Sequence, residues 1–91
     1  MSERADALAR LRARIVENDR AIVEAVNERL RLVAELWQLK DARGTARFDP
    51  DREQRLREEL AAANSGPLSP EGLDALVAEL LALTKRELDR P

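Results

Sequence analysis

The most constraining feature of this chain is a stretch of forty residues, Ser2–Asp41, that contains neither glycine nor proline. Apolar side chains recur in it at the helical period, so the stretch is predicted to form one continuous helix. Such a helix is about 60 Å long, too long to bury its apolar stripe against two short helices of its own chain. We therefore expect a partner chain, and a symmetric dimer is the commonest arrangement. The stripe consists of Leu8, Leu11, Ile15, Ile22, Val26, Val33 and Trp37.

Two breaks divide the rest of the chain into two shorter helices. After a loop that contains Gly44, Asp49 is followed by a proline, which is the pattern of an N-cap and a first helical residue. The sequence Asn-Ser-Gly-Pro at 64–67 ends this second helix, and Ser69 with its proline begins a third. The prediction is a single all-α domain over residues 1–91, with helices at about 2–41, 49–64 and 69–89.

Composition excludes several classes of function. Charged residues make up 37% of the chain, but the net charge is only −2, so the basic surface that nucleic acids and anionic membranes require is not expected. The chain has no Cys and no His, which excludes disulfides and His-based catalysis and argues against zinc. It also shows no apolar signal segment and no membrane span. We therefore expect a cytoplasmic protein without a metal or cofactor.

Several charged residues lie on the apolar stripe of the first helix. On a helical wheel Arg29, Lys40 and Arg12 fall inside or beside it, and Asp19 falls there as well. Buried cations are costly unless they are paired, so an anionic group is expected to meet them. One interpretation is that Asp19 and neighbouring glutamates neutralise them, or that the long side chains reach out to water. The other interpretation is that they bind an anionic ligand.

The spacing of these cations favours a ligand. Arg29 and Lys40 are eleven residues apart, which places them on one helix face with about 16 Å between them along the axis. Arg12 is rotated away and too distant on the same helix, whereas the partner's Arg12 is able to approach that point. The other two helices contribute a further cation, an inward carboxylate and a hydroxyl, which are those of Arg52, Glu53 and Thr84 in that order.

In order and spacing, these residues resemble the all-α chorismate mutases. The resemblance covers nearly the whole chain, from Leu8 to about Leu88, and includes both breaks. It implies an intertwined helical homodimer of the chorismate mutase II type, with two sites that are each completed by the partner's first helix. It also implies the pericyclic rearrangement of chorismate to prephenate, without a cofactor, on the route to Phe and Tyr. The motif residues are Leu11, Arg12, Ile15, Asp19, Asn27, Glu28, Arg29, Lys40, Asp49, Arg52 and Glu53.

The resemblance also assigns roles to the substrate-binding arginines. Arg29 and the partner's Arg12 would hold the two carboxylates of chorismate, with Arg52 and Thr84 assisting. Arginine suits this task because its planar guanidinium binds a carboxylate through two parallel hydrogen bonds.

Three further residues are implied in the chemistry itself. Lys40 would donate to the ether oxygen as negative charge develops there. Glu53, together with the backbone near Asp49, would bind the substrate hydroxyl.

The third helix departs from the family pattern. The family usually has Gln or Glu four residues after the Ser or Thr of this helix, as a second donor to the ether oxygen. Here that position is Leu88, with Glu87 one residue earlier, and ideal helix geometry turns both inward. We favour a missing donor, because the spacing from Thr84 to Leu88 matches the family pattern.

Two other functions are consistent with the sequence. The missing donor fits a module of low intrinsic activity that regulates, or is activated by, another shikimate-pathway enzyme. Isochorismate-pyruvate lyase shares the fold, but a shorter loop between Lys40 and Arg52 would be expected for it. A coiled-coil adaptor would have no need of Arg29 and Lys40 within its seam.

Overall fold

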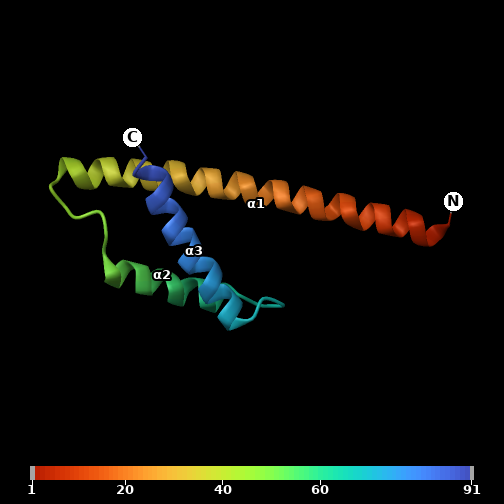
Figure 1. The fold of residues 1–91 in the computed structure, drawn as a ribbon. Coiled ribbons are helices and arrows are strands. Elements are labelled where there is room, and N and C mark those ends of the chain that lie inside the picture. Colours follow the sequence, from red (N-terminus) through yellow and green to blue (C-terminus); the bar gives the residue numbers. More distant parts are fainter. Residues whose placement is uncertain (1, 91) are drawn as a thin grey trace. The chain divides into compact units, whose positions relative to one another are not determined.

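The computed structural model describes residues 2–90 and contains three helices in this part of the chain. They are α1 (Glu3–Ala42), α2 (Pro50–Ala63) and α3 (Pro70–Leu88), and the residues described include no strand (Figure 1). The all-α fold and the order of long, short and medium helices are therefore confirmed.

Capping explains why α2 and α3 are each shorter than predicted by one residue at either end. Asp49 and Ser69 have extended backbone and lie before their helices as N-caps, and Asn64 and Asp89 follow them as C-caps. The Asp49 side chain accepts hydrogen bonds from the backbone N–H groups of residues 51 and 52, and the Ser69 hydroxyl accepts one from residue 72. Each cap thus satisfies N–H groups that have no partner within the helix.

A Schellman motif around Gly44 ends α1. Gly44 has a φ of 69°, a left-handed conformation that glycine adopts without strain. The Thr45 N–H donates to the Lys40 carbonyl at 2.8 Å, and the Gly44 N–H donates to the Asp41 carbonyl at 3.1 Å. Both bonds satisfy carbonyls of the last turn and reverse the chain, so the loop that follows lies beside the end of α1.

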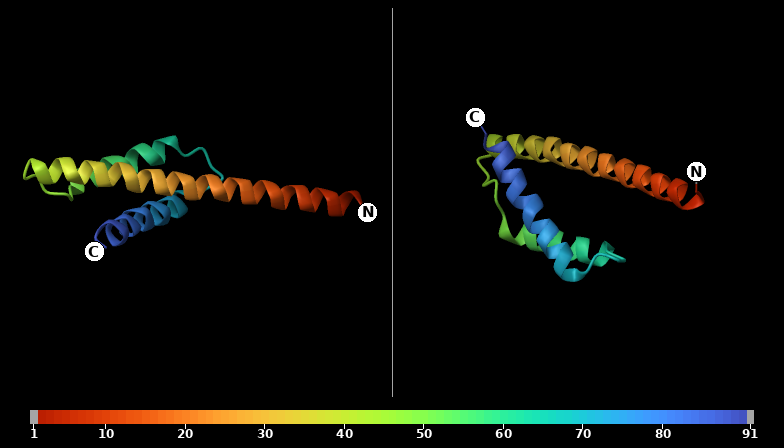
Figure 2. Two further views of the ribbon diagram at one scale, coloured as in Figure 1. Left: turned by 90° about the horizontal axis from the view of Figure 1, so that it is seen from above. Right: turned by 45° about the vertical axis from the view of Figure 1, so that its right-hand side comes forward.

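The chain divides into two units, residues 1–32 and residues 33–91. In the second unit α2 and α3 are in contact, and α3 turns back from the 64–69 connection (Figure 2). Leu73 and Val77 of α3 are buried there, and Leu56 and Leu60 of α2 are half-buried. Leu76 of the same helix as Leu73 remains exposed.

Within the first unit the apolar stripe of α1 is uncovered in the single chain. Its four large residues in this unit are about half exposed: Leu8 49%, Leu11 54%, Ile15 58% and Ile22 53%. By contrast Trp37, at the C-terminal end of the same stripe, is only 7% exposed. Within residues 2–90, none of the helices has the length and apolar character needed to cross a membrane.

Candidate active site

The loop between α1 and α2 is held against the end of α1 by two aromatic rings in contact, each of which also contacts a cation. The Arg47 guanidinium carbon lies 4.7 Å from the centre of the Trp37 ring. Phe48 meets Trp37 edge to face, with 5.6 Å between ring centres, and the Lys85 ammonium lies 4.7 Å from the Phe48 ring centre. We call Arg47, Trp37, Phe48 and Lys85 the cation–aromatic stack. It buries Trp37 and connects α1, the loop and α3.

An ion pair extends this stack to α2. The Lys85 ammonium lies 3.8 Å from the Glu53 carboxylate. Glu53 is half-buried in the first turn of α2, and Lys85 directly follows Thr84 in α3. The structure therefore brings one predicted site residue, Glu53, against α3 through a lysine that the sequence analysis did not single out.

Lys40 is the predicted site residue on α1 within this unit. It is half-buried in the last turn of the helix, and its ammonium donates a hydrogen bond to the Arg47 backbone carbonyl at 3.0 Å. A lysine has three N–H donors. This bond therefore uses one of them and leaves two for other acceptors.

Arg47 is fixed by acidic side chains as well as by Trp37. Its Nε and Nη2 donate to the two oxygens of Asp41 at 3.0 and 2.6 Å, and its Nη1 lies 3.7 Å from Asp89. The hydrogen bond from Arg47 lowers the pKa of the Asp41 carboxyl below its ordinary value. The pair is therefore fully formed above the ordinary pKa of an aspartate and is lost as the pH falls through the lowered value.

The start of α2 provides the remaining predicted polar groups. Asp49 is half-buried, and its Oδ1 accepts from the backbone N–H groups of Asp51 at 3.1 Å and Arg52 at 3.3 Å. The Arg52 side chain is exposed. The positive end of the α2 dipole thus lies at the turn that carries the predicted hydroxyl-binding residues.

Thr84 and its neighbours define the contribution of α3. Thr84 is 6% exposed, and its hydroxyl donates to the Leu80 carbonyl at 2.7 Å. Glu87 is exposed and lies 3.3 Å from the Arg90 guanidinium, whereas Leu88 is half-buried. In its ion pair with Arg90 the Glu87 carboxylate accepts a hydrogen bond, and a carboxylate is unable to donate one.

Arg12 and Arg29 lie on α1 in the first unit. Arg12 is exposed and Arg29 is half-buried. The remaining predicted site residues belong to the second unit, and the part of every one of these residues in a site stays a prediction.

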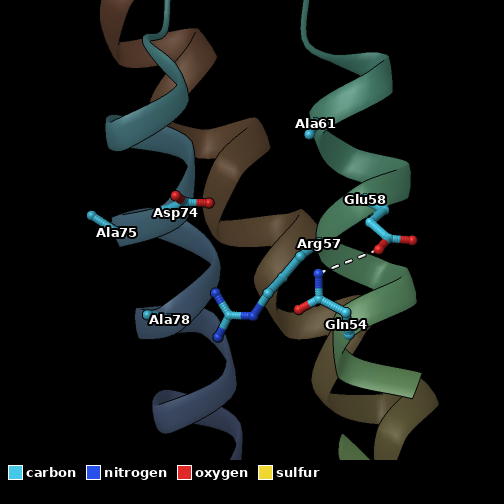
Figure 3. Close-up of a pocket in the computed structure, with 7 residues that line it drawn as sticks. All are labelled: Gln54, Arg57, Glu58, Ala61, Asp74, Ala75 and Ala78. Atoms are coloured by element: carbon cyan, nitrogen blue, oxygen red, sulfur yellow. Dashed lines mark hydrogen bonds between the residues drawn. The ribbon is translucent and has the colours of Figure 1, made fainter. Parts of the chain in front are cut away.

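A separate open groove lies between α2 and α3 on another face of α2. Figure 3 shows the Arg57 side chain extending from α2 toward α3, and Gln54 donating to Glu58 at 3.3 Å. None of the predicted site residues lines this groove. The part of the chain described here also contains no cluster of acidic residues able to hold a metal ion. The groove is lined by Gln54, Arg57, Glu58, Ala61, Asp74, Ala75 and Ala78.

Comparison with known proteins shows the same architecture. The chain matches the family model described as chorismate mutase type II over residues 11–87. The chain belongs to this family. A solved structure of chorismate mutase (form II) from Thermus thermophilus has a TM-score of 0.86 and 30% sequence identity, covering 92% of this chain and 96% of that chain. Form I from the same organism has a TM-score of 0.82 and 31% identity, covering 86% of this chain and 98% of that chain.

No curated protein matches the chain. The family nevertheless confirms the resemblance that the sequence indicated and the expected function as a chorismate mutase, an isomerase of the shikimate pathway.

Proposed function

We propose that this chorismate mutase rearranges chorismate to prephenate at two equivalent sites of a homodimer. The observation that carries the proposal is the family match over residues 11–87, which contains every residue to which a role is assigned except Leu88. We also propose that residues 1–91 act as one domain, in the cytoplasm.

The uncovered stripe of α1 supports the dimer. Leu8, Leu11, Ile15 and Ile22 are about half exposed in a single chain, and burial of apolar surface is the main favourable term in association. A second copy presents the same stripe, so a two-fold axis lets each chain cover the other. The same arrangement would bring the partner's Arg12 to the site that Arg29 and Lys40 serve.

The rearrangement is pericyclic and needs no nucleophile, metal or proton transfer. The enzyme has to hold the reactive diaxial conformer and to stabilise charge that develops on the ether oxygen. In our proposal Arg29 of one chain and the partner's Arg12 bind the two carboxylates, and the exposed Arg52 assists them. Thr84 assists only after its hydroxyl exchanges the Leu80 carbonyl for a substrate carboxylate.

Lys40 and Glu53 are suited to the polar groups at the centre of the substrate. Lys40 keeps two N–H donors beyond the one given to Arg47, and one of these would donate to the ether oxygen. Glu53 faces the Lys85 ammonium, and its carboxylate would accept a hydrogen bond from the substrate hydroxyl. The backbone near Asp49 would contact the same hydroxyl.

Loss of chorismate absorbance in the presence of purified protein tests this function. We expect turnover that needs no added metal or cofactor, with prephenate as the only product. Release of pyruvate from isochorismate, without conversion of chorismate, would instead identify a lyase.

A second candidate is a chorismate mutase of low intrinsic activity that another shikimate-pathway enzyme activates. The side chains at the end of α3 favour it, because Leu88 has no donor and Glu87 is paired with Arg90. Adding candidate partner enzymes to the same assay distinguishes the two. A large rise in turnover would identify a partner-activated module, and an unchanged rate would support a free-standing enzyme.

Leu88→Gln should accelerate turnover, because it supplies the donor that the third helix lacks. Loss of one preorganised donor costs about 3 kcal/mol in comparable oxyanion sites, so the gain should reach roughly 100-fold in kcat. Glu87→Gln is the matched control and should change kcat little. A rate that climbs as the pH falls toward 5, and loses this climb in Glu87→Ala, would show that protonated Glu87 is the donor instead.

A further inference from the structure

One loop residue, Arg47, contacts side chains at the end of α1 and just after α3. The Arg47 side chain makes a bidentate bond to Asp41 on α1, lies near Asp89 just after α3, and covers the face of Trp37. A guanidinium held on three sides in this way has little rotational freedom, since its planar fork must satisfy two oxygens at once. These contacts therefore restrain the loop at Arg47 through its side chain.

The backbone carbonyl of this same residue accepts the Lys40 hydrogen bond at 3.0 Å. Lysine has a flexible four-carbon side chain, so its ammonium needs an external contact to stay in one place. Asp41 follows Lys40 in the sequence. Arg47 therefore contacts two adjacent residues of the last turn of α1, Asp41 through its side chain and Lys40 through its carbonyl.

We propose that Arg47 is a positioning residue. Its side-chain contacts with Asp41, Asp89 and Trp37 hold its backbone carbonyl in place. That carbonyl in turn orients the Lys40 ammonium toward the ether oxygen of the substrate. This inference rests on the proposed role of Lys40. Arg47 itself does not touch substrate in this scheme. It acts by limiting the positions that the Lys40 ammonium samples.

These side-chain contacts of Arg47 are expected to affect the catalytic rate far more than the stability of the fold. The ion pairs among them are partly exposed, and pairs of that kind contribute little to folding. A misplacement of about 1 Å in a catalytic group, in contrast, is enough to lower a rate roughly 100-fold. A purely structural role would predict the opposite, a lower melting temperature with kcat retained.

The test compares Arg47→Ala with Arg43→Ala, which removes the same charge from an exposed position in the same loop. Arg47→Ala should lower kcat roughly 10- to 100-fold, with KM changed less than about 3-fold and the melting temperature within a few degrees. Arg43→Ala should leave all three near the wild-type values. Arg47→Lys keeps the charge but not the planar fork, so it should lower kcat as well and provides a second folded variant.

Combination with Lys40→Met separates positioning from other effects. If Arg47 acts through Lys40, Arg47→Ala should lower kcat no further in the Lys40→Met protein. An equal fold loss in both backgrounds would overturn the proposal, as would an Arg47→Ala protein as active as Arg43→Ala.

A readout independent of catalysis is the acetylation rate of Lys40 with acetic anhydride, followed by mass spectrometry. We expect it to rise several-fold in Arg47→Ala and to stay unchanged in Arg43→Ala. If the wild-type protein is inactive on chorismate and Arg47→Ala still shows this rise, the proposed function is refuted and the positioning is retained. An unchanged rate would refute the positioning whatever the activity.

Discussion

Mixing the Arg12→Ala and Arg29→Ala proteins should restore about a quarter of the wild-type activity, although each alone should be nearly inactive. In the proposed dimer each site takes Arg29 from one chain and Arg12 from the other. A mixed dimer therefore has one site with both arginines and one site with neither. Random exchange makes about half of the dimers mixed, and one of the two sites in each is intact.

The experiment requires the two proteins to be unfolded together and refolded, with dimer exchange verified by differently tagged chains. Refolding each variant alone is the control and should restore nothing. If both arginines served the same chain's site, every site in the mixture would lack one of them. Mixed dimers without activity would therefore show that Arg12 does not act across the interface.

Lys40→Met should lower turnover by a factor on the order of 100 to 1000, because it removes a preorganised donor from the ether oxygen. The fold should tolerate the change. The substitution removes the hydrogen bond from the ammonium to the Arg47 carbonyl, and a single hydrogen bond contributes about 1 kcal/mol net. We therefore expect the melting temperature to fall by no more than about 8 °C.

Circular dichroism and single-turnover kinetics on the same preparation separate the two effects. Substrate binding should weaken less than the chemical step slows, since the carboxylates remain bound by arginines. A folded Lys40→Met protein with a near-normal rate would remove Lys40 from the mechanism. It would also refute the proposed role of Arg47.

The helices were predictable from sequence because local signals define them. A long stretch without glycine or proline predicts α1, and a capping residue followed by proline predicts the starts of α2 and α3. Errors of one residue arose at the ends of all three helices, and at α2 and α3 the reason is that Asp49 and Ser69 stand outside the helices that they cap. Trp37 was interpreted as a core residue from its place on the stripe, and its burial agrees with this.

The contacts of the loop could not be predicted in the same way. Arg47 and Phe48 lie in a segment without periodicity, and their partners Asp89 and Lys85 are about forty residues further along the chain. No local rule connects such positions, because the reversal at Gly44 and the return of α3 bring them together. The one available signal was compositional, since Phe48 is the only Phe and Lys85 is one of two lysines.

The cation–aromatic stack also gives the protein a native optical probe. The chain has one Trp and no Tyr, so the Trp37 indole dominates its near-ultraviolet emission over the weak emission of Phe48. Arg47 lies over the face of that indole and Phe48 against its edge, so the emission depends on where the loop lies. Loop movement during turnover is therefore measurable by fluorescence in the unlabelled protein. In a symmetric dimer the two indoles share one environment, so both chains contribute equally to any change in emission.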